Sequence, residues 1–164
     1  MTFPKRKNIR LKGYDYSQDG AYFITLCTHK RIPLFGKIRN EKVELNKNGM
    51  IVRDSWLEMQ SFYPSIQLDE FVIMPNHFHA VLFLVGVDSV DPEDTTSKPN
   101  IGSIIAHFKN LCTRRINRIH NTVGVKRWQR NYYEHVIRNE DELLKVREYI
   151  QNNPLKWQLD KYFS

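Results

Sequence analysis

Cysteine is scarce in this sequence. Only Cys27 and Cys112 are present among 164 residues, and they stand far apart without a Cys-x-x-Cys pair. Disulfide frameworks and zinc ribbons need several cysteines at short spacing, so both are excluded. We expect the two thiols to be reduced and packed in the core, as in a protein of a reducing compartment.

Long apolar runs are also missing. The longest extends from Ala80 to Val87, which is too short to cross a bilayer, and no apolar segment of a signal peptide follows the basic N-terminal residues. We therefore expect no membrane association and a cytoplasmic location. Hydrophobic residues make up 41% of the chain, which suffices for one ordinary core. A single domain over residues 1–164 is expected.

Acidic residues are few in the C-terminal part. Residues 98–164 hold 13 Lys and Arg against 6 Asp and Glu, whereas residues 1–97 hold 12 of each kind. Within the balanced part, a basic arm (residues 1–13) contains cations and no acid before Asp15: Lys5, Arg6, Lys7, Arg10 and Lys12. This asymmetry favours a polyanionic partner that contacts the arm through phosphates, with nucleic acid preferred to a membrane. The alternative is an ordinary solvated surface.

The stretch FVIMPNHFHAVLFLV, residues 71–85, is the centre of the chain's organisation. Two apolar runs meet at Pro75-Asn76, a turn-forming pair, which predicts two antiparallel strands with a tight connection. Because side chains alternate along a strand, His77 and His79 share one face. Two neighbouring imidazoles can hold one divalent metal ion, and the alternative is a pair of histidines with ordinary structural partners.

The remaining elements follow from periodicity and turn residues. We predict strands over residues 21–28, 68–74, 77–85 and 128–138, a hairpin over 34–45 at the sheet's edge, and helices over 50–62, 100–119 and 139–153. Residues 86–99 contain four acids and two prolines and are expected to form an acidic, mobile loop. This order predicts an α+β domain with a ferredoxin-like or RRM-like antiparallel sheet and helices packed mainly on one face.

Both ends of the third predicted helix have recognisable signals. Asn139 can cap its start, and Glu142, three residues later, can complete a capping box. Pro154 is expected to end the helix and to turn Asn153 away from helical backbone angles.

One stripe of this helix carries chemically useful side chains. Lys145, Tyr149 and Asn153 recur every four residues. Asn153 can add an oxygen to His77 and His79 in a metal site, and a divalent ion there can act as a Lewis acid on a phosphodiester. Tyr149 would be the attacking nucleophile. Its phenol is mostly protonated at neutral pH, so activation must come from the metal, from a cation such as Lys145, or from a base that the sequence does not identify.

Several other residues have both a functional and a structural interpretation. The second helix has a basic row that either contacts phosphates or is only solvated: Lys109, Arg114 and Arg118. His135 can orient substrate, although a strand histidine bonded to backbone is the favoured interpretation. Tyr132, Tyr133 and Trp128 either stack on unpaired bases or fill the core, and the two tyrosines cannot face the same side.

Three segments together resemble a known family: IRLKGYDYSQDGAYFITLCTHKR, LDEFVIMPNHFHAVLFL and WQRNYYEHVIRNEDELLKVREYIQNNPLKW. They are similar to the HUH-type single-tyrosine transposases of the insertion sequence 200/605 group, and most of all to the bacterial REP-associated tyrosine transposases. The segments cover most of the chain. The combination of MPNHxH, YYEHxIRNE and YIxxNPxKW makes the resemblance specific.

The resemblance implies a site as well as a fold. His77, His79 and Asn153 would bind Mg²⁺ or Mn²⁺, and Tyr149 would attack single-stranded DNA beside a hairpin or palindromic repeat. Attack would leave a 5′-phosphotyrosine and a free 3′-hydroxyl, so the chain would nick and rejoin DNA without an external energy source. The implied protein is bacterial and nucleoid-associated, and is either a monomer or a homodimer, with its tyrosine serving its own chain's histidines or its partner's.

Two other functions compete with this one. A nucleotide hydrolase with a histidine triad would need a third alternate histidine, where this chain has Val81. A non-catalytic regulator derived from a transposase would bind single-stranded or hairpin nucleic acid and would need no nucleophile. A covalent adduct with labelled hairpin DNA separates the enzyme from the regulator.

Overall fold

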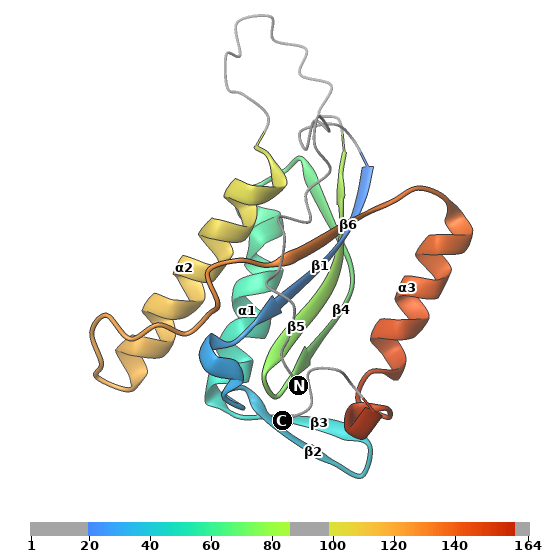
Figure 1. Cartoon of the computed structure of the whole chain (residues 1–164). Helices are drawn as coiled ribbons and strands as arrows, with labels where there is room; N and C mark the ends of the chain where they lie inside the picture. Colours follow the sequence, from blue (N-terminus) through green and yellow to red (C-terminus); the bar gives the residue numbers. More distant parts are fainter. Residues whose placement is uncertain (1–19, 86–98, 160–164) are drawn as a thin grey trace, which may run out of the picture.

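The computed structural model describes residues 20–85 and 99–159. Its elements, in chain order, are β1 (Gly20–Cys27), η1 (His29–Arg31), β2 (Gly36–Arg39), β3 (Lys42–Leu45), α1 (Lys47–Phe62), β4 (Ile66–Met74), β5 (His77–Leu84), α2 (Ile101–Ile119), β6 (Tyr133–Ile137), α3 (Glu140–Asn152) and η2 (Trp157–Leu159) (Figure 1). The predicted order of strands and helices is confirmed. The predicted basic arm lies outside the described residues, as does the predicted acidic loop except for Pro99.

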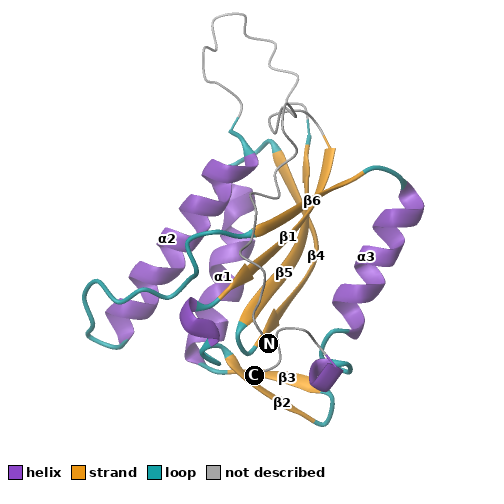
Figure 2. Ribbon diagram, viewed as in Figure 1, coloured by secondary structure: helices purple, strands orange, loops and turns teal. Residues whose placement is uncertain are grey.

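Four strands form one antiparallel sheet in the order β4-β5-β1-β6. The predicted tight connection at Pro75-Asn76 joins β4 to β5, with Met74 opposite His77. Helices α1 and α2 cover one face of the sheet, and α3 covers the other (Figure 2). This is the expected ferredoxin-like α+β arrangement, to which α3 adds a layer on the second face.

The larger core lies between the sheet and helices α1 and α2. At its centre, the ring of Trp56 lies 5.1 Å from that of Phe78 and 5.0 Å from that of Phe108, measured between centroids. A smaller apolar cluster lies under α3 and includes Phe23, Val81 and Ile150. Because β5 is covered on both faces, its alternating side chains supply both clusters. Both cysteines are buried free thiols, as expected.

An asparagine precedes each of the three helices. The side-chain oxygens of Asn46, Asn100 and Asn139 accept hydrogen bonds from the backbone N–H three residues later, at 3.0, 2.8 and 2.8 Å. The predicted start of the first helix at residue 50 is therefore three residues late. Gly49 lies in the first turn of this helix, and only glycine fits there because a Cβ would lie 2.2 Å from the carbonyl oxygen of Phe35.

Two predictions about strands are wrong. The hairpin β2–β3 forms a two-stranded sheet of its own and does not extend the main sheet. The last strand begins at Tyr133, five residues later than expected, because Trp128 pairs with Thr28 in an isolated bridge before the chain reaches β6.

Two predictions about α3 are also wrong. Asn153 keeps helical angles, with φ −59° and ψ −44°, because its N–H still bonds to the carbonyl of Ile150 at 3.3 Å. The capping box is not completed, since the carboxylate of Glu142 accepts from the N–H of Arg138 at 2.9 Å and not from that of Asn139. No helix within residues 20–85 and 99–159 has the length and apolarity needed to span a membrane.

Candidate active site

His77 and His79 begin strand β5 and face α3, as the alternation predicted. Their rings lie 4.6 Å apart between centroids, and the two residues are 0% and 1% exposed. Phe23, on the neighbouring strand β1, stacks on the His79 ring at 5.4 Å. Such burial restricts the rings to a few orientations, so the pair is held in place before any ligand arrives.

A polar neighbour orients each imidazole. The Nδ1 atom of His77 lies 2.8 Å from Oδ1 of Asn76, whose own amide nitrogen donates to the carbonyl of Arg31 at 3.4 Å. His77 therefore donates through Nδ1–H and carries its lone pair on Nε2. The hydroxyl of Thr25 lies 2.7 Å from Nδ1 of His79 and can accept from an Nδ1–H there. Metal-binding histidines are commonly oriented in this way.

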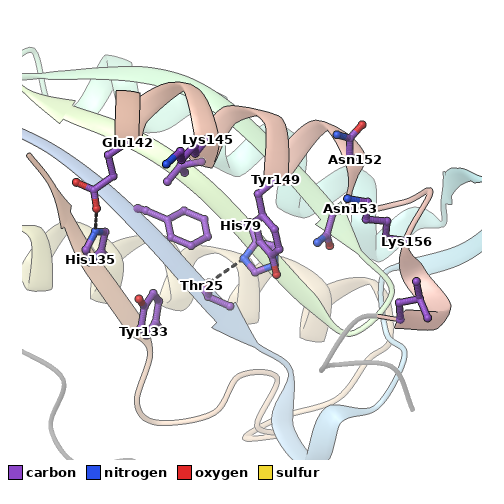
Figure 3. Close-up of a pocket in the computed structure, with 13 residues that line it drawn as sticks. Thr25, His79, Tyr133, His135, Glu142, Lys145, Tyr149, Asn152, Asn153 and Lys156 are labelled. Carbon is purple, nitrogen blue, oxygen red and sulfur yellow. Dashed lines mark hydrogen bonds and ion pairs between the residues drawn. The ribbon is translucent and has the colours of Figure 1, made fainter. Parts of the chain in front are cut away.

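Helix α3 and the C-cap that follows it bring Tyr149 and Asn153 to the histidine pair, and Figure 3 shows both residues beside His79. The Oδ1 atom of Asn153 lies 3.3 Å from Nε2 of His77, and the Tyr149 ring lies 5.3 Å from that of His79 between centroids. Asn153 is 3% exposed, whereas Tyr149 is 42% exposed. An amide oxygen thus lies inside the site, and a phenol lies at its surface within reach of a large substrate.

An ion pair fastens α3 to the strand next to the histidines. Arg147 donates two hydrogen bonds to Asp69, at 2.7 and 2.6 Å, in a bidentate arrangement. Asp69 lies at a register shift of β4 between Leu68 and Phe71, a bulge that breaks the regular alternation of side chains. The hydrogen bond from Arg147 lowers the pKa of the Asp69 carboxyl below its usual value. Asp69 is therefore ionised at neutral pH and ties α3 to β4 two residues before Tyr149.

A cleft of about 580 Å³ runs between α3 and strands β1 and β6. At one end it is lined by His79, Tyr149 and Asn153, with Lys156 nearby, and at the other by His135 and Glu142, with Lys145 nearby (Figure 3). The lysines give the cleft a cationic rim without occupying its floor. A polyanion is the class of ligand that such a rim attracts.

The side chains at the histidine end fit a divalent metal ion. With the tautomer described above, Nε2 of His77 and Oδ1 of Asn153 are both acceptors and face each other at 3.3 Å. Neighbouring ligands of an octahedral ion with bonds near 2.1 Å are about 3 Å apart, so a cation can satisfy both atoms. No group of three His, Cys, Asp or Glu side chains suited to a metal occurs in the described part of the chain. Two imidazoles and one amide oxygen can hold one divalent ion and leave positions for further oxygen ligands.

No protein-family model matches the chain, but it is similar to a bacterial protein over nearly its whole length. An uncharacterized protein of Haemophilus influenzae (strain ATCC 51907 / DSM 11121 / KW20 / Rd) is 40% identical over 170 residues, which cover 96% of this chain and 93% of that protein. The chain belongs to that protein's family.

The chain is also similar to two proteins named as REP-associated tyrosine transposases. A putative REP-associated tyrosine transposase of the same organism is 25% identical over 150 residues, covering 87% of this chain and 74% of that protein. A solved REP-associated tyrosine transposase, bound to a REP hairpin, has a TM-score of 0.61 at 20% identity and covers 98% of this chain and 77% of its own. The resemblance to REP-associated tyrosine transposases predicted from sequence is confirmed.

The structure divides the basic row that was expected on α2. Lys109 donates to the carbonyls of Gln129 and Arg130 at 2.6 and 3.1 Å, and burial lowers its pKa. Arg114 and Arg118 are exposed. Lys109 thus holds the segment before β6, and the two arginines remain accessible to phosphates.

The aromatic residues near β6 are sorted by face. Trp128 is 6% exposed and packs its ring 5.1 Å from that of Phe35, so it belongs to the core. Tyr132 packs against the larger cluster and Tyr133 against the smaller one, on opposite sides as predicted. Trp157, beyond α3, stacks on His77 at 6.0 Å between centroids.

Sequence reasoning missed the residues that orient the others. Thr25 and Asn76 carry no motif of their own, although Asn76 precedes His77 within MPNHxH. His135 was expected to bond to backbone, yet its Nε2 bonds to the carboxylate of Glu142. Glu142 had been considered only as a capping residue. Spacing along one helix or strand cannot show the Thr25–His79 and His135–Glu142 pairs, because each joins two elements, whereas Asn76 could have been found as the direct neighbour of His77.

Proposed function

We propose that this chain is a metal-dependent enzyme that nicks and rejoins single-stranded DNA next to hairpin or palindromic sequences. The observation that carries the proposal is that Tyr149 and Asn153 of α3 lie beside His77 and His79 of β5. The side chains that would serve as nucleophile and metal ligands thus lie at one end of a cleft with a cationic rim. The hairpin bound by the solved REP-associated tyrosine transposase supports the choice of DNA structure.

The reaction is a transfer of the phosphoryl group from sugar to protein. The phenol oxygen of Tyr149 attacks the phosphorus, and a bond from tyrosine to phosphorus forms as the bond from phosphorus to the 3′-oxygen breaks. The phenol loses its proton to solvent and the 3′-oxygen takes one up, which leaves a 5′-phosphotyrosine and a 3′-hydroxyl. Attack by a 3′-hydroxyl on the phosphotyrosine reverses these steps and rejoins a strand.

The side chains around Tyr149 have separate tasks. His77, His79 and Asn153 would hold Mg²⁺ or Mn²⁺, which supplies Lewis-acid stabilisation of charge on a non-bridging phosphate oxygen. Asn76 accepts from Nδ1–H of His77 and so directs the lone pair of its Nε2 toward that ion, and Thr25 would do the same for His79 by accepting from its Nδ1–H. Lys145 and Lys156 line the cleft and attract the DNA backbone.

The nucleophile assignment has a direct test. Labelled single-stranded hairpin DNA incubated with Mn²⁺ should give a covalent protein–DNA adduct on a denaturing gel. Tyr149→Phe should abolish the adduct, whereas Tyr132→Phe, on the opposite face of the sheet, should leave it at the normal level. An undiminished adduct in Tyr149→Phe would disprove this role. Hairpin binding without any adduct in the unaltered protein would instead support a non-catalytic regulator. The basic C-terminal part is compatible with DNA binding by either kind of protein.

The metal assignment has an independent test. Mn²⁺ binding, followed by calorimetry, should be lost in the His77→Ala/His79→Ala double variant. His120→Ala is the matched control, because His120 bonds to Asn48 far from the cleft. Retained Mn²⁺ binding in the double variant would place the metal elsewhere.

We further propose that one chain suffices for the reaction, since Tyr149 meets the histidines of its own chain. A mixture of Tyr149→Phe with the His77→Ala/His79→Ala variant should then remain inactive. Restored adduct formation in that mixture would show that subunits exchange their α3 helices.

A further inference from the structure

The cleft has two polar ends, and the proposed chemistry uses only one of them. Glu142 stands seven residues before Tyr149 on α3, which corresponds to about 10 Å along the helix axis. The cleft is also lined by Phe23, Tyr133 and Val146. The ring of Phe23 contacts those of both Tyr133 and Tyr149, each at 6.1 Å between centroids, and so gives the cleft an apolar part between its two polar ends. The second end is therefore close enough to Tyr149 to contact a nucleotide next to the DNA phosphate that Tyr149 would attack.

The second end presents a carboxylate that is oriented and still accessible. One oxygen of Glu142 accepts from Nε2 of His135, and the other accepts from the N–H of Arg138 at 2.9 Å. These bonds lower the pKa of Glu142 below its usual value, so it is ionised at neutral pH. A carboxylate has about four acceptor positions, and two bonds leave the remainder for a ligand. The side chain is 28% exposed, which allows that contact.

An ionised carboxylate in a cleft for DNA is unsuited to phosphate and suited to a base. Like charge repels the backbone, whereas the edges of guanine, adenine and cytosine carry N–H donors that a carboxylate accepts. The floor beside Glu142 includes Tyr133, whose ring lies 6.1 Å from that of Phe23 in an edge-to-face arrangement. Aromatic rings in such positions stack on unpaired bases in proteins that bind single strands.

Resting on the proposed function, we propose that the His135–Glu142 end of the cleft is a subsite for one unpaired, amino-bearing nucleobase next to the cleaved phosphodiester. Glu142 accepts a hydrogen bond from the edge of the base, His135 keeps the carboxylate in place, and Tyr133 offers its ring to the face of the base. The subsite makes cleavage depend on base identity at one flanking position. Thymine, whose edge has one ring N–H and no amino group, is disfavoured there.

The test uses DNA hairpins with a five-nucleotide single-stranded flank. Each flanking position carries A, C, G, T or an abasic site in turn, and binding is measured by fluorescence anisotropy in the Tyr149→Phe background, which cannot cut. One position should show at least tenfold weaker binding with T or an abasic site than with the preferred base. Glu142→Gln should lower that discrimination to below threefold, since an amide loses the charge and half of the acceptor capacity.

Glu148→Gln is the matched control, because it removes the same charge from an exposed position of the same helix outside the cleft lining. It should keep the full base preference. Unaltered preference in Glu142→Gln, with thermal unfolding showing that the variant is folded, would overturn the subsite. Adduct formation by the protein with Tyr149 intact is scored separately. Its absence counts against the proposed nicking reaction, while a base preference that depends on Glu142 would still establish the subsite.

Discussion

The two faces of the sheet are stabilised in different ways. On one face, α2 buries eight of its residues, and its aromatic contacts join those of α1 and β5 in a continuous core. On the other face, α3 buries only Ile150 and is fastened by the Arg147–Asp69 ion pair. The first face therefore supplies most of the apolar burial, and the second leaves room for a cleft.

This difference separates stability from function. Apolar burial is close-packed and leaves few openings, whereas a helix with one buried and two partly buried apolar side chains and one bidentate ion pair can border a cleft. Each candidate catalytic side chain lies on the α3 side. Substitutions on the α1–α2 face should therefore mainly lower the free energy of unfolding, whereas substitutions on the α3 face should mainly lower the rate of DNA cleavage.

The largest expected effect concerns the core. Trp56→Ala should lower the free energy of unfolding by about 4 kcal/mol, because it removes a fully buried indole and leaves a cavity. Leu143→Ala, which truncates a half-buried side chain on the sheet-facing side of α3, should lower the free energy of unfolding by only about 1 kcal/mol. Urea unfolding followed by circular dichroism measures both. Equal losses would contradict the contrast between the faces.

Comparing two similar ion pairs tests whether the attachment of α3 matters for cleavage. Arg115 and Glu58 join α2 to α1 by two hydrogen bonds of 3.0 and 2.8 Å, as Arg147 and Asp69 join α3 to β4. Because both pairs are partly exposed, Glu58→Gln and Asp69→Asn should each cost about 1 kcal/mol of stability or less. Only Asp69→Asn should slow adduct formation, by about tenfold, since a displaced α3 misplaces Tyr149.

The exchange of charges sharpens this prediction. Asp69→Arg combined with Arg147→Asp should recover part of the lost cleavage rate, whereas either change alone should not. A rate for Asp69→Asn equal to that for Glu58→Gln would show that the ion pair of α3 does not position Tyr149.

The pH dependence of stability should show a smaller effect of the same pair. The folded-state pKa of Asp69 is lowered below its unfolded value, near 3.9, so the stabilisation is present above that pH and is lost as pH falls through the folded pKa. Between pH 7 and pH 3, Asp69→Asn should lose less stability than the unaltered protein, by under about 1 kcal/mol. Urea midpoints at the two pH values measure the difference, and a larger loss in the variant would give the wrong sign.

The smallest expected effect concerns the two cysteines, which should stay unmodified in the native protein. Burial raises the pKa of the Cys112 thiol to about 12, and Cys27 is 1% exposed. Neither thiol should react with iodoacetamide at pH 8 until the core opens, because the thiolate is the reactive form. Mass spectrometry after timed labelling, with and without urea, measures this. Rapid labelling of Cys112 in the native protein would show that the core of the α1–α2 face is less closed than the structure indicates.

Much of the fold was predictable because local signals agreed with the final contacts. The turn at Pro75-Asn76, the alternation of His77 and His79, and the cap at Asn100 are encoded in neighbouring residues and are confirmed. Predictions failed where a local preference met a tertiary contact. Asn153 stays helical although it precedes Pro154, and Glu142 turns to His135 and Arg138 instead of closing its capping box.

The candidate site was predictable only in part for the same reason. The stripe of Lys145, Tyr149 and Asn153 follows from helical spacing, and all three line the cleft. Their distance from the histidines does not follow from spacing, because it depends on α3 packing against the second face of the sheet. The partners Thr25 and Asp69 were missed, since each acts through a residue of another element.

By itself, the amino-acid sequence determined the strand and helix order, the shared face of His77 and His79, and the stripe that contains Tyr149, because these depend on periodicities along one stretch of chain. Tertiary structure alone decided that α3 covers the face of the sheet opposite α1 and α2, which brings Asn153 to 3.3 Å from His77. The physical reason is that the Arg147–Asp69 pair and the burial of Ile150 act between residues distant in sequence, where no local pattern records them.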